Sequence, residues 1–280
     1  MLLLTSLWGF QQVAIKLVAA DVSLVMQAGI RSILATLLLL AWAKYRSIPL
    51  FNSDGTLWAG LGAGVLFAAE FVFIYAGLEH TNASRMSVFI YLAPPLTALG
   101  LHLFVPGERM RALQWAGVGL AFAGIVLAFS DGFVSGRSTW LGDLFGIIAA
   151  VLWAATTVLI RATSLSRATA TKTLFYQLAV SALVLPIASL LLGEPGIVNM
   201  SGAAILSLAY QGAIVAFATY LAWFWLLTRY LATRLSVLSF LTPMFGVLSG
   251  VVFLSESLGA RFLLAALLVA SGIVLVNIRR

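Results

Sequence analysis

The hydrophobic positions of the chain gather in ten long runs, and most charged residues fall in the short connections between them. Each run is near the roughly 20 residues that an α-helix needs to cross a bilayer. The runs are Leu2–Ala20, Leu24–Ala43, Leu57–Leu78, Met86–Phe104, Leu113–Phe129, Leu141–Ile160, Thr173–Leu192, Ala203–Leu227, Leu235–Leu254 and Phe262–Ile278. A spanning helix satisfies its own backbone hydrogen bonds, and the alternating segments of about ten residues that a β-barrel requires are absent. The pattern predicts an all-α integral membrane protein with ten transmembrane helices.

Composition and charge support this fold class. Hydrophobic residues make up 62% of the 280 residues and charged residues only 9%, whereas about a quarter of the residues are charged in a soluble domain. The formal net charge of +7 comes from basic residues that are scattered singly between apolar runs, which argues against a nucleic-acid partner. The absence of cysteine excludes thiolate chemistry and cysteine-ligated metal.

The lysines and arginines predict an orientation. With a cytoplasmic N-terminus, eleven of the 16 basic residues lie on the inner side of the membrane. The five on the outer side would be Lys16, Arg31, Arg85, Arg137 and Arg261. Because basic residues prefer the cytoplasmic side, we expect a multi-pass protein of the cytoplasmic (inner) membrane with both termini in the cytoplasm.

Two stretches show that a unit of five runs occurs twice. "ASRMSVFIYLAPPLTALG", from Ala83 to Gly100, aligns with "ATRLSVLSFLTPMFGVLSG", from Ala232 to Gly250. "LWGFQQVAIK", from Leu7, aligns with "LWAATTVLIR", from Leu152. Because five is an odd number, the second unit must enter the membrane upside down. The sequence therefore predicts two inverted repeats, residues 1–130 and 141–280, which is typical of transporters with a substrate site between the halves.

The repeated motifs resemble those of a known family. "TNASRMSVFIYLAPPLTALG" followed by "PGE" at Pro106–Glu108, and "YLATRLSVLSFLTPMFG" followed by "LSE" at Leu254–Glu256, resemble the EamA-like repeats of the drug/metabolite transporter (DMT) superfamily. This resemblance implies a ten-helix transporter and covers essentially the whole chain. The aromatic content, with Trp8, Tyr75, Tyr91 and Trp153, resembles that of the YddG-type aromatic amino-acid exporters.

Matched positions in the fourth and ninth runs form a stripe of hydroxyl, aromatic and proline residues. Ser84, Ser87, Tyr91 and Pro94 share one helical face. The matched positions in the second half are Thr233, Ser236, Phe240 and Pro243. The stripe could face a transport pathway, or the small residues could serve helix packing. Pro94 and Pro243 could act as hinges or as static kinks.

Aromatic and polar residues at matched positions of other runs complete the candidate site. Phe71 and Tyr75 match Tyr220 and Phe224, whereas Trp8, Gln11 and Gln12 match Trp153, Thr156 and Thr157. An apolar lining with few polar groups is typical of small-molecule sites. The predicted substrate-binding residues are Trp8, Gln11, Gln12, Phe71, Tyr75, Ser87, Tyr91, Trp153, Thr156, Thr157, Tyr220, Phe224, Ser236 and Phe240.

The carboxylates have two expected roles. Glu70 lies in the middle of the third run, where a charge is costly. It could couple transport to protons, or it could be protonated and hydrogen-bonded between helices; its repeat mate is Thr219. Glu108 and Glu256 precede the fifth and tenth runs and are expected at the N-termini of those helices.

These observations predict a secondary transporter that exports small amphipathic solutes, above all amino acids including aromatic ones, by alternating access. The scarcity of ionisable residues within the runs argues against a substrate of large net charge. An exporter of drugs or quaternary or aromatic cations is the alternative, and a passive channel is a further one. With two histidines and no HExxH or GxSxG motif, we expect no enzyme, cofactor or metal site. The expected partners are a small-molecule substrate and membrane lipid, without an obligate protein partner.

Overall fold

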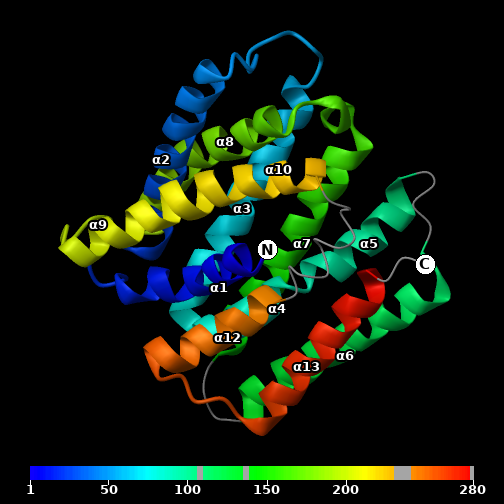
Figure 1. The fold of residues 1–280 in the computed structure, drawn as a ribbon. Helices are drawn as coiled ribbons and strands as arrows, with labels where there is room; N and C mark the ends of the chain where they lie inside the picture. The colour runs from blue at the N-terminus through cyan, green and yellow to red at the C-terminus, as the bar shows by residue number, and fades with distance from the viewer. Residues whose placement is uncertain (106–109, 135–138, 230–240, 278–280) are drawn as a thin grey trace.

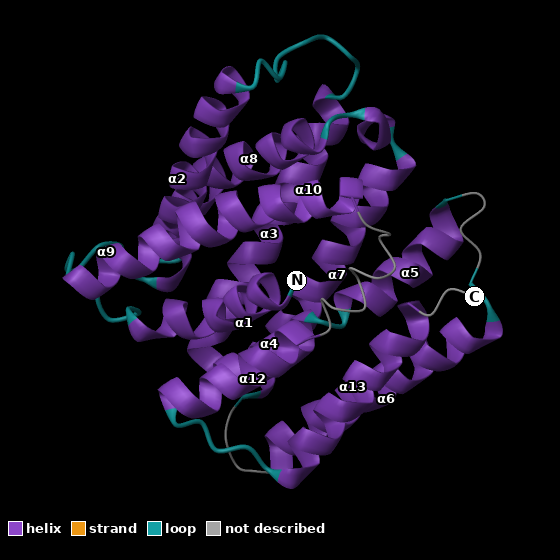
Figure 2. Ribbon diagram, in the orientation of Figure 1, coloured by secondary structure: helices purple, strands orange, loops and turns teal. Residues whose placement is uncertain are grey.

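The structure, a computed structural model, describes residues 1–105, 110–134, 139–229 and 241–277. These residues form helices and connecting loops, with a single isolated β-bridge between Val22 and Ile197 (Figure 2). The helices are α1 (Leu2–Leu17), α2 (Leu24–Tyr45), α3 (Leu57–His80), α4 (Ala83–Ile90), α5 (Ala93–Phe104), α6 (Ala112–Val134), α7 (Trp140–Ala162), the 3-10 helix η1 (Ser164–Arg167), α8 (Ala170–Leu191), α9 (Gly202–Ala209), the π-helix η2 (Tyr210–Thr219), α10 (Tyr220–Arg229), α12 (Leu241–Leu254) and α13 (Ala260–Asn277).

The helices confirm the membrane class. Within the described residues, each apolar run falls mainly on one helix or on consecutive helices. Six helical segments within the described part of the chain are long and apolar enough to cross a membrane, and three shorter apolar helices accompany them. Large apolar side chains such as Trp58 and Leu191, each 82% exposed, lie on the outside. Extended exposed apolar surface marks contact with lipid or protein, so the molecule is a multi-pass membrane protein.

Helices from the two parts of the chain pack against one another. The helices α6 and α13 run side by side, α2 lies along α8, and α1 packs on α12 (Figure 1). The helix α3 contacts both α7 and α8. Much of the core therefore forms between the two parts of the chain.

The fourth run is broken near its prolines. The helix α4 ends at Ile90 and α5 begins at Ala93, with Pro94 and Pro95 in its first turn. A proline is tolerated there because the first N–H groups of a helix have no intrahelical acceptor. The predicted bend at Pro94 is thus a break between two helices. Pro243 is the third residue of α12, and residues 230–240 before it lie outside the described residues.

Carboxylates from distant connections cap two helix N-termini. Glu256, after α12, accepts hydrogen bonds from the amides of Ala83 and Ser84 at 2.8 and 3.0 Å. Glu194, after α8, accepts from the amides of Val25 and Met26 at 3.0 and 3.2 Å. Each carboxylate satisfies amides that have no acceptor within their own helix. The prediction that Glu256 serves the helix following it is therefore wrong, because it caps α4 instead.

A lysine fixes the start of α8 in a related manner. The Lys172 Nζ donates to Asp54 Oδ2 at 2.8 Å and to Asn52 Oδ1 at 2.8 Å, in the connection after α2. The hydrogen bond from Lys172 holds the pKa of the Asp54 carboxyl well below its ordinary value. The ion pair thus ties the start of α8 to the connection between α2 and α3.

A buried ion pair joins α4 to α7. Arg85 and Asp143 have side chains that are 6% and 0% exposed, and Arg85 Nη2 lies 2.5 Å from Asp143 Oδ2. Arg85 Nη2 also donates to the Ala128 carbonyl at 2.6 Å, and the Thr81 hydroxyl donates to Asp143 Oδ1 at 2.7 Å. Because both charges have several partners, the pair is a structural connection.

We expect the Asp143→Asn variant to lose about 3–5 kcal/mol of stability, because it leaves the Arg85 charge buried without its counter-charge. Thermal unfolding in detergent measures the loss. In the Arg85→Met, Asp143→Asn double variant neither charge remains, so it should be more stable than the single variant. Equal stability of the native protein and Asp143→Asn would contradict the structural role of the pair.

Candidate functional site

An arginine that sequence reasoning placed at the outer side of the membrane lies inside the molecule. Arg31 is 0% exposed. Arg31 belongs to α2, which begins at Leu24. At the usual rise per residue it lies about 10 Å along the helix axis from that first residue. Charge counting assigned Arg31 to a side of the membrane but did not show which neighbours its helix face meets. Arg31 is the functional candidate that the sequence analysis missed.

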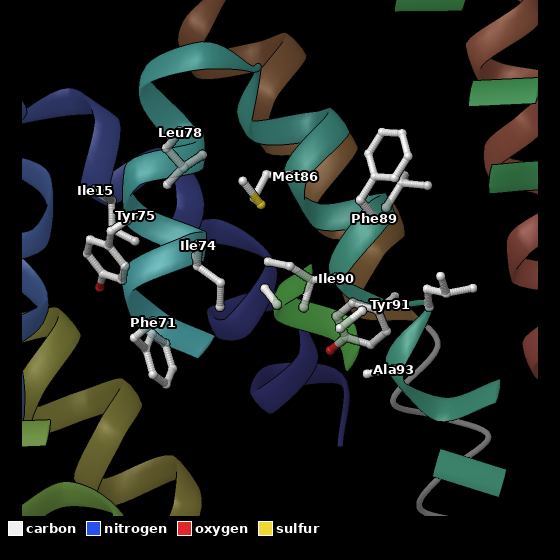
Figure 3. Packing of buried hydrophobic residues seen from close by; sticks show 14 of the residues in the cluster. Ile15, Phe71, Ile74, Tyr75, Leu78, Met86, Phe89, Ile90, Tyr91 and Ala93 are labelled. Atoms are coloured by element: carbon white, nitrogen blue, oxygen red, sulfur yellow. The ribbon is translucent and has the colours of Figure 1, made fainter. Parts of the chain in front are cut away.

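Aromatic rings of α3 lie beneath this arginine. The Arg31 guanidinium carbon is 4.0 Å from the centroid of the Phe71 ring and 5.8 Å from that of Tyr75. Both rings project from the same side of α3 (Figure 3), as their spacing predicted. Tyr220, the first residue of α10, also approaches the guanidinium. The structure therefore gathers three predicted site residues around one unpredicted cation.

The predicted carboxylate lies in the same region. Glu70 of α3 is 4% exposed and is close enough to interact electrostatically with Arg31 and Tyr220. Within the described ranges, the Glu70 Oε2 atom and all three Arg31 side-chain nitrogens lack a hydrogen-bond partner. A guanidinium and a carboxyl group therefore lie near each other, both buried, and the Arg31 nitrogens make no hydrogen bond to the Glu70 Oε2 atom.

The energetic cost of this arrangement is substantial. Desolvating a charged group costs several kcal/mol even after relaxation. A desolvated cation–π contact such as that of Arg31 on Phe71 returns about 2 kcal/mol. The three Arg31 nitrogens and the Glu70 Oε2 atom lack the hydrogen bonds that Arg85 and Asp143 give each other in the described structure. The cluster of Arg31, Glu70, Phe71, Tyr75 and Tyr220, hereafter the charged centre, is therefore suited to hold polar groups of opposite sign.

The Tyr75 hydroxyl belongs to a buried chain of hydrogen bonds. It donates to Gln211 Oε1 at 2.8 Å, and Gln211 Nε2 donates to Gln27 Oε1 at 2.9 Å and to the Ser207 hydroxyl at 3.1 Å. Gln27 Nε2 donates in turn to the Ile15 carbonyl at 3.1 Å. The chain links α1, α2, α3, α9 and η2. Sequence reasoning missed both glutamines, although an amide inside an apolar run was a visible signal.

The predicted tryptophans lie in two further contacts. The Trp153 and Tyr91 rings meet edge to face, with centroids 5.8 Å apart. Trp8 Nε1 donates to the Thr219 hydroxyl at 2.7 Å, and its ring meets that of Trp223 at 5.7 Å. Thr219 is the repeat mate of Glu70, so Trp8 contacts the position that corresponds to the carboxylate.

Several predicted hydroxyl groups bond within their own helices. Ser87 donates to the Ala83 carbonyl, Thr156 to that of Leu152, and Thr157 to that of Trp153. Such bonds to the preceding turn are common for Ser and Thr in helices. These hydroxyls therefore have partners before any substrate arrives.

The remaining predicted residues are the amides and three positions of the second half. Gln11 is 8% exposed, and Gln12 Oε1 is buried without a hydrogen-bond partner in the described structure. Ser236 and Phe240 lie outside the described residues, as does the Phe224 side chain. Where the structure is described, no group of three or more His, Asp or Glu side chains could hold a metal ion.

Comparisons with known proteins give consistent results. A model of the EamA-like transporter family matches residues 1–130 and 140–278. The "Probable amino-acid metabolite efflux pump" of Escherichia coli K12 is 26% identical over 97% of this chain and 91% of its own length. A chloroplastic WAT1-related protein of Arabidopsis thaliana is 30% identical over 96% of this chain and 66% of its own length. A solved crystal structure shares 19% identity and a TM-score of 0.66, covering 98% of this chain and 94% of its own; it supports the fold alone.

The Tyr75→Phe variant should be less stable by about 1–3 kcal/mol, because it leaves the buried Gln211 Oε1 atom without its donor. Thermal unfolding measures the change. Tyr45→Phe is the matched control, because the Tyr45 side chain is 80% exposed. If Tyr75→Phe and Tyr45→Phe unfold at the same temperature, the hydrogen-bonded chain does not stabilise the fold.

Proposed function

Because the chain belongs to the EamA-like transporter family, we propose that it exports amino acids, including aromatic ones, across the cytoplasmic membrane. The observation that carries this proposal is the charged centre with its aromatic neighbours, because a small zwitterion with an apolar body needs both polar and apolar contacts. The name of the Escherichia coli relative, an amino-acid metabolite efflux pump, supports the same substrate class.

Alternating access between two inverted repeats, residues 1–130 and 141–280, is the proposed mechanism. The family match to both parts of the chain supports the repeat. The packing supports it further, because α2 and α8, which hold corresponding runs, lie together, as do α6 and α13. The start of α2 is held by the connection after α8, and the start of α8 by the connection after α2. This reciprocity is expected of two units related by a two-fold axis.

The proposed substrate site lies where the aromatic contacts converge. Phe71, Tyr75 and Tyr220 surround Arg31, and Tyr91 is close to both Trp153 and Tyr220. Aromatic pairs prefer edge-to-face or offset geometry, so a substrate ring could add to this set without displacing it. The lining would then bind the apolar part of the substrate.

The break between α4 and α5 is the proposed hinge in the first half. Only two residues, Tyr91 and Leu92, separate the helices, and Pro94 is the second residue of α5. Because Pro94 cannot donate a backbone hydrogen bond, the two helices can change their relative angle at low cost. Tyr91 would move with the hinge, together with its contact to Trp153. The positive-inside bias supports cytoplasmic termini for this arrangement.

The function is tested by counterflow in proteoliposomes. Unlabelled L-phenylalanine inside should accelerate uptake of labelled L-phenylalanine, which a channel would not show. Trp153→Ala should slow this exchange about twofold to tenfold, because it removes an aromatic contact of the proposed site. Trp58→Ala is the matched control, since Trp58 is 82% exposed. An absence of counterflow by the native protein, or native exchange by Trp153→Ala, would refute the proposal.

A separate variant tests coupling to protons. Glu70 is buried, and the charged or titratable groups that act on it are Arg31 of α2 and Tyr220 of α10. If its carboxyl carries the coupling proton, Glu70→Gln should lose the acceleration of export by an imposed pH gradient, measured as the ratio of its own transport rates with and without the gradient. Transport by Glu70→Gln that responds to the gradient as the native protein does would make Glu70 a structural residue.

A further inference from the structure

We propose that Arg31 and Glu70 together bind the head group of a zwitterionic α-amino acid, with the carboxylate on Arg31 and the ammonium on Glu70. This inference rests on the proposed function, because it identifies the groups that would recognise an amino acid within the charged centre. It concerns a pair that the family resemblance did not indicate and whose arginine the sequence analysis considered only in the charge count of the outer side.

The first step of the argument is that Arg31 differs from the other buried cations. Arg85 is paired with Asp143, and Lys172 is paired with Asp54. Arg31 has no hydrogen-bond partner for any of its three side-chain nitrogens among the described residues, although it is 0% exposed. A guanidinium presents parallel N–H donors that match the two oxygens of a carboxylate. Arg31 therefore has donors available at a buried position.

The second step concerns Glu70. It is the nearby acidic side chain that acts electrostatically on Arg31 and Tyr220. Its Oε2 atom is buried and accepts no hydrogen bond within the described part of the chain, so the two groups do not satisfy each other. An ammonium group supplies three donors and a positive charge, which are the complements of this acceptor.

The third step is that a guanidinium with a carboxyl group nearby complements the carboxylate and the ammonium of an α-amino acid. In such a zwitterion a carboxylate and an ammonium are attached to one carbon, and its net charge is zero. Binding would pair Arg31 with the substrate carboxylate and the ionised form of Glu70 with the substrate ammonium, and these four charges sum to zero. A quaternary cation would satisfy Glu70 but meet the repulsion of Arg31, and a phosphate dianion would meet that of Glu70.

The fourth step places the side chain of the substrate. Phe71 lies under the Arg31 guanidinium at 4.0 Å, and Tyr75 lies beside it at 5.8 Å. The edge-to-face pair of Tyr91 and Trp153 lies near Tyr220. An aromatic or large aliphatic side chain would therefore extend from the head group toward these rings. The predicted ligand class is α-amino acids with a bulky apolar side chain.

The test uses three ligands of similar shape on the purified protein. L-phenylalanine carries both charges, L-phenylalaninamide lacks the carboxylate, and 3-phenylpropanoate lacks the ammonium. Binding is measured by calorimetry and by the rise in unfolding temperature that each ligand causes. The native protein should bind L-phenylalanine about tenfold or more tightly than either analogue, because each analogue loses one charge-assisted interaction.

Two variants test which residue binds the carboxylate of the ligand and which binds its ammonium. Arg31→Gln should bind L-phenylalanine and L-phenylalaninamide equally, and Glu70→Gln should bind L-phenylalanine and 3-phenylpropanoate equally. Arg46→Gln, which alters an exposed arginine stacked on Trp42 at the other end of α2, should bind as the native protein does. If Arg31→Gln does not fold, Arg31→Lys keeps the charge without the paired donors and should retain a reduced preference.

The outcomes separate this inference from the proposed function. If Arg31→Gln still prefers L-phenylalanine over L-phenylalaninamide as the native protein does, the assignment of Arg31 is overturned. If Glu70→Gln still prefers L-phenylalanine over 3-phenylpropanoate, the assignment of Glu70 is overturned. A native protein without preference among the ligands would overturn the site as a whole. If the native protein binds L-phenylalanine as described but shows no counterflow, the proposed function fails and the head-group site stands. If counterflow occurs without discrimination, the site fails and the function stands.

Discussion

A charge removed from water into the interior of a membrane protein must find a counter-charge or hydrogen-bond partners, because desolvation costs several kcal/mol per ion. Arg85 meets this constraint through Asp143, and Lys172 meets it through Asp54 and Asn52. Both pairs join elements that are distant in sequence. Arg31 and Glu70 are the exception in the described structure. The three Arg31 side-chain nitrogens and the Glu70 Oε2 atom are buried without a hydrogen-bond partner. Because departures from such rules are expected at functional sites, these two residues are the basis of the head-group site that we propose.

The same constraint acts on the backbone. The first amides of a helix have no intrahelical acceptor, and within a membrane water is scarce. Glu256 supplies acceptors to the start of α4 and Glu194 to the start of α2. Both come from connections far along the chain, so the caps that complete these helices also hold the two parts of the molecule together. Within the described residues, the break between α4 and α5 has no such cap from a distant connection, and it is the hinge that we propose.

Much of the architecture could be predicted because hydropathy and helix length report directly on membrane crossing. The ten runs, the bend near Pro94 and the common face of Phe71 and Tyr75 follow from local pattern alone. The burial of Arg31 does not, because a periodic pattern shows which residues share a face but not what that face meets. The cap that Glu256 provides depends on contacts with α4, which lies more than 150 residues earlier in the chain. The pairing of Gln27 with Gln211 could not be predicted from the sequence either, since neither residue belongs to a matched motif.

The central claim is that a bound amino acid completes the charged centre. A structure of the protein determined with L-phenylalanine by cryo-electron microscopy or crystallography tests it most directly. The account predicts the carboxylate within hydrogen-bonding distance of the Arg31 guanidinium, the ammonium near Glu70, and the ring beside Phe71, Tyr75 or Tyr220. A ligand bound elsewhere in the molecule, or Arg31 and Glu70 hydrogen-bonded directly to each other in the loaded protein, would contradict it.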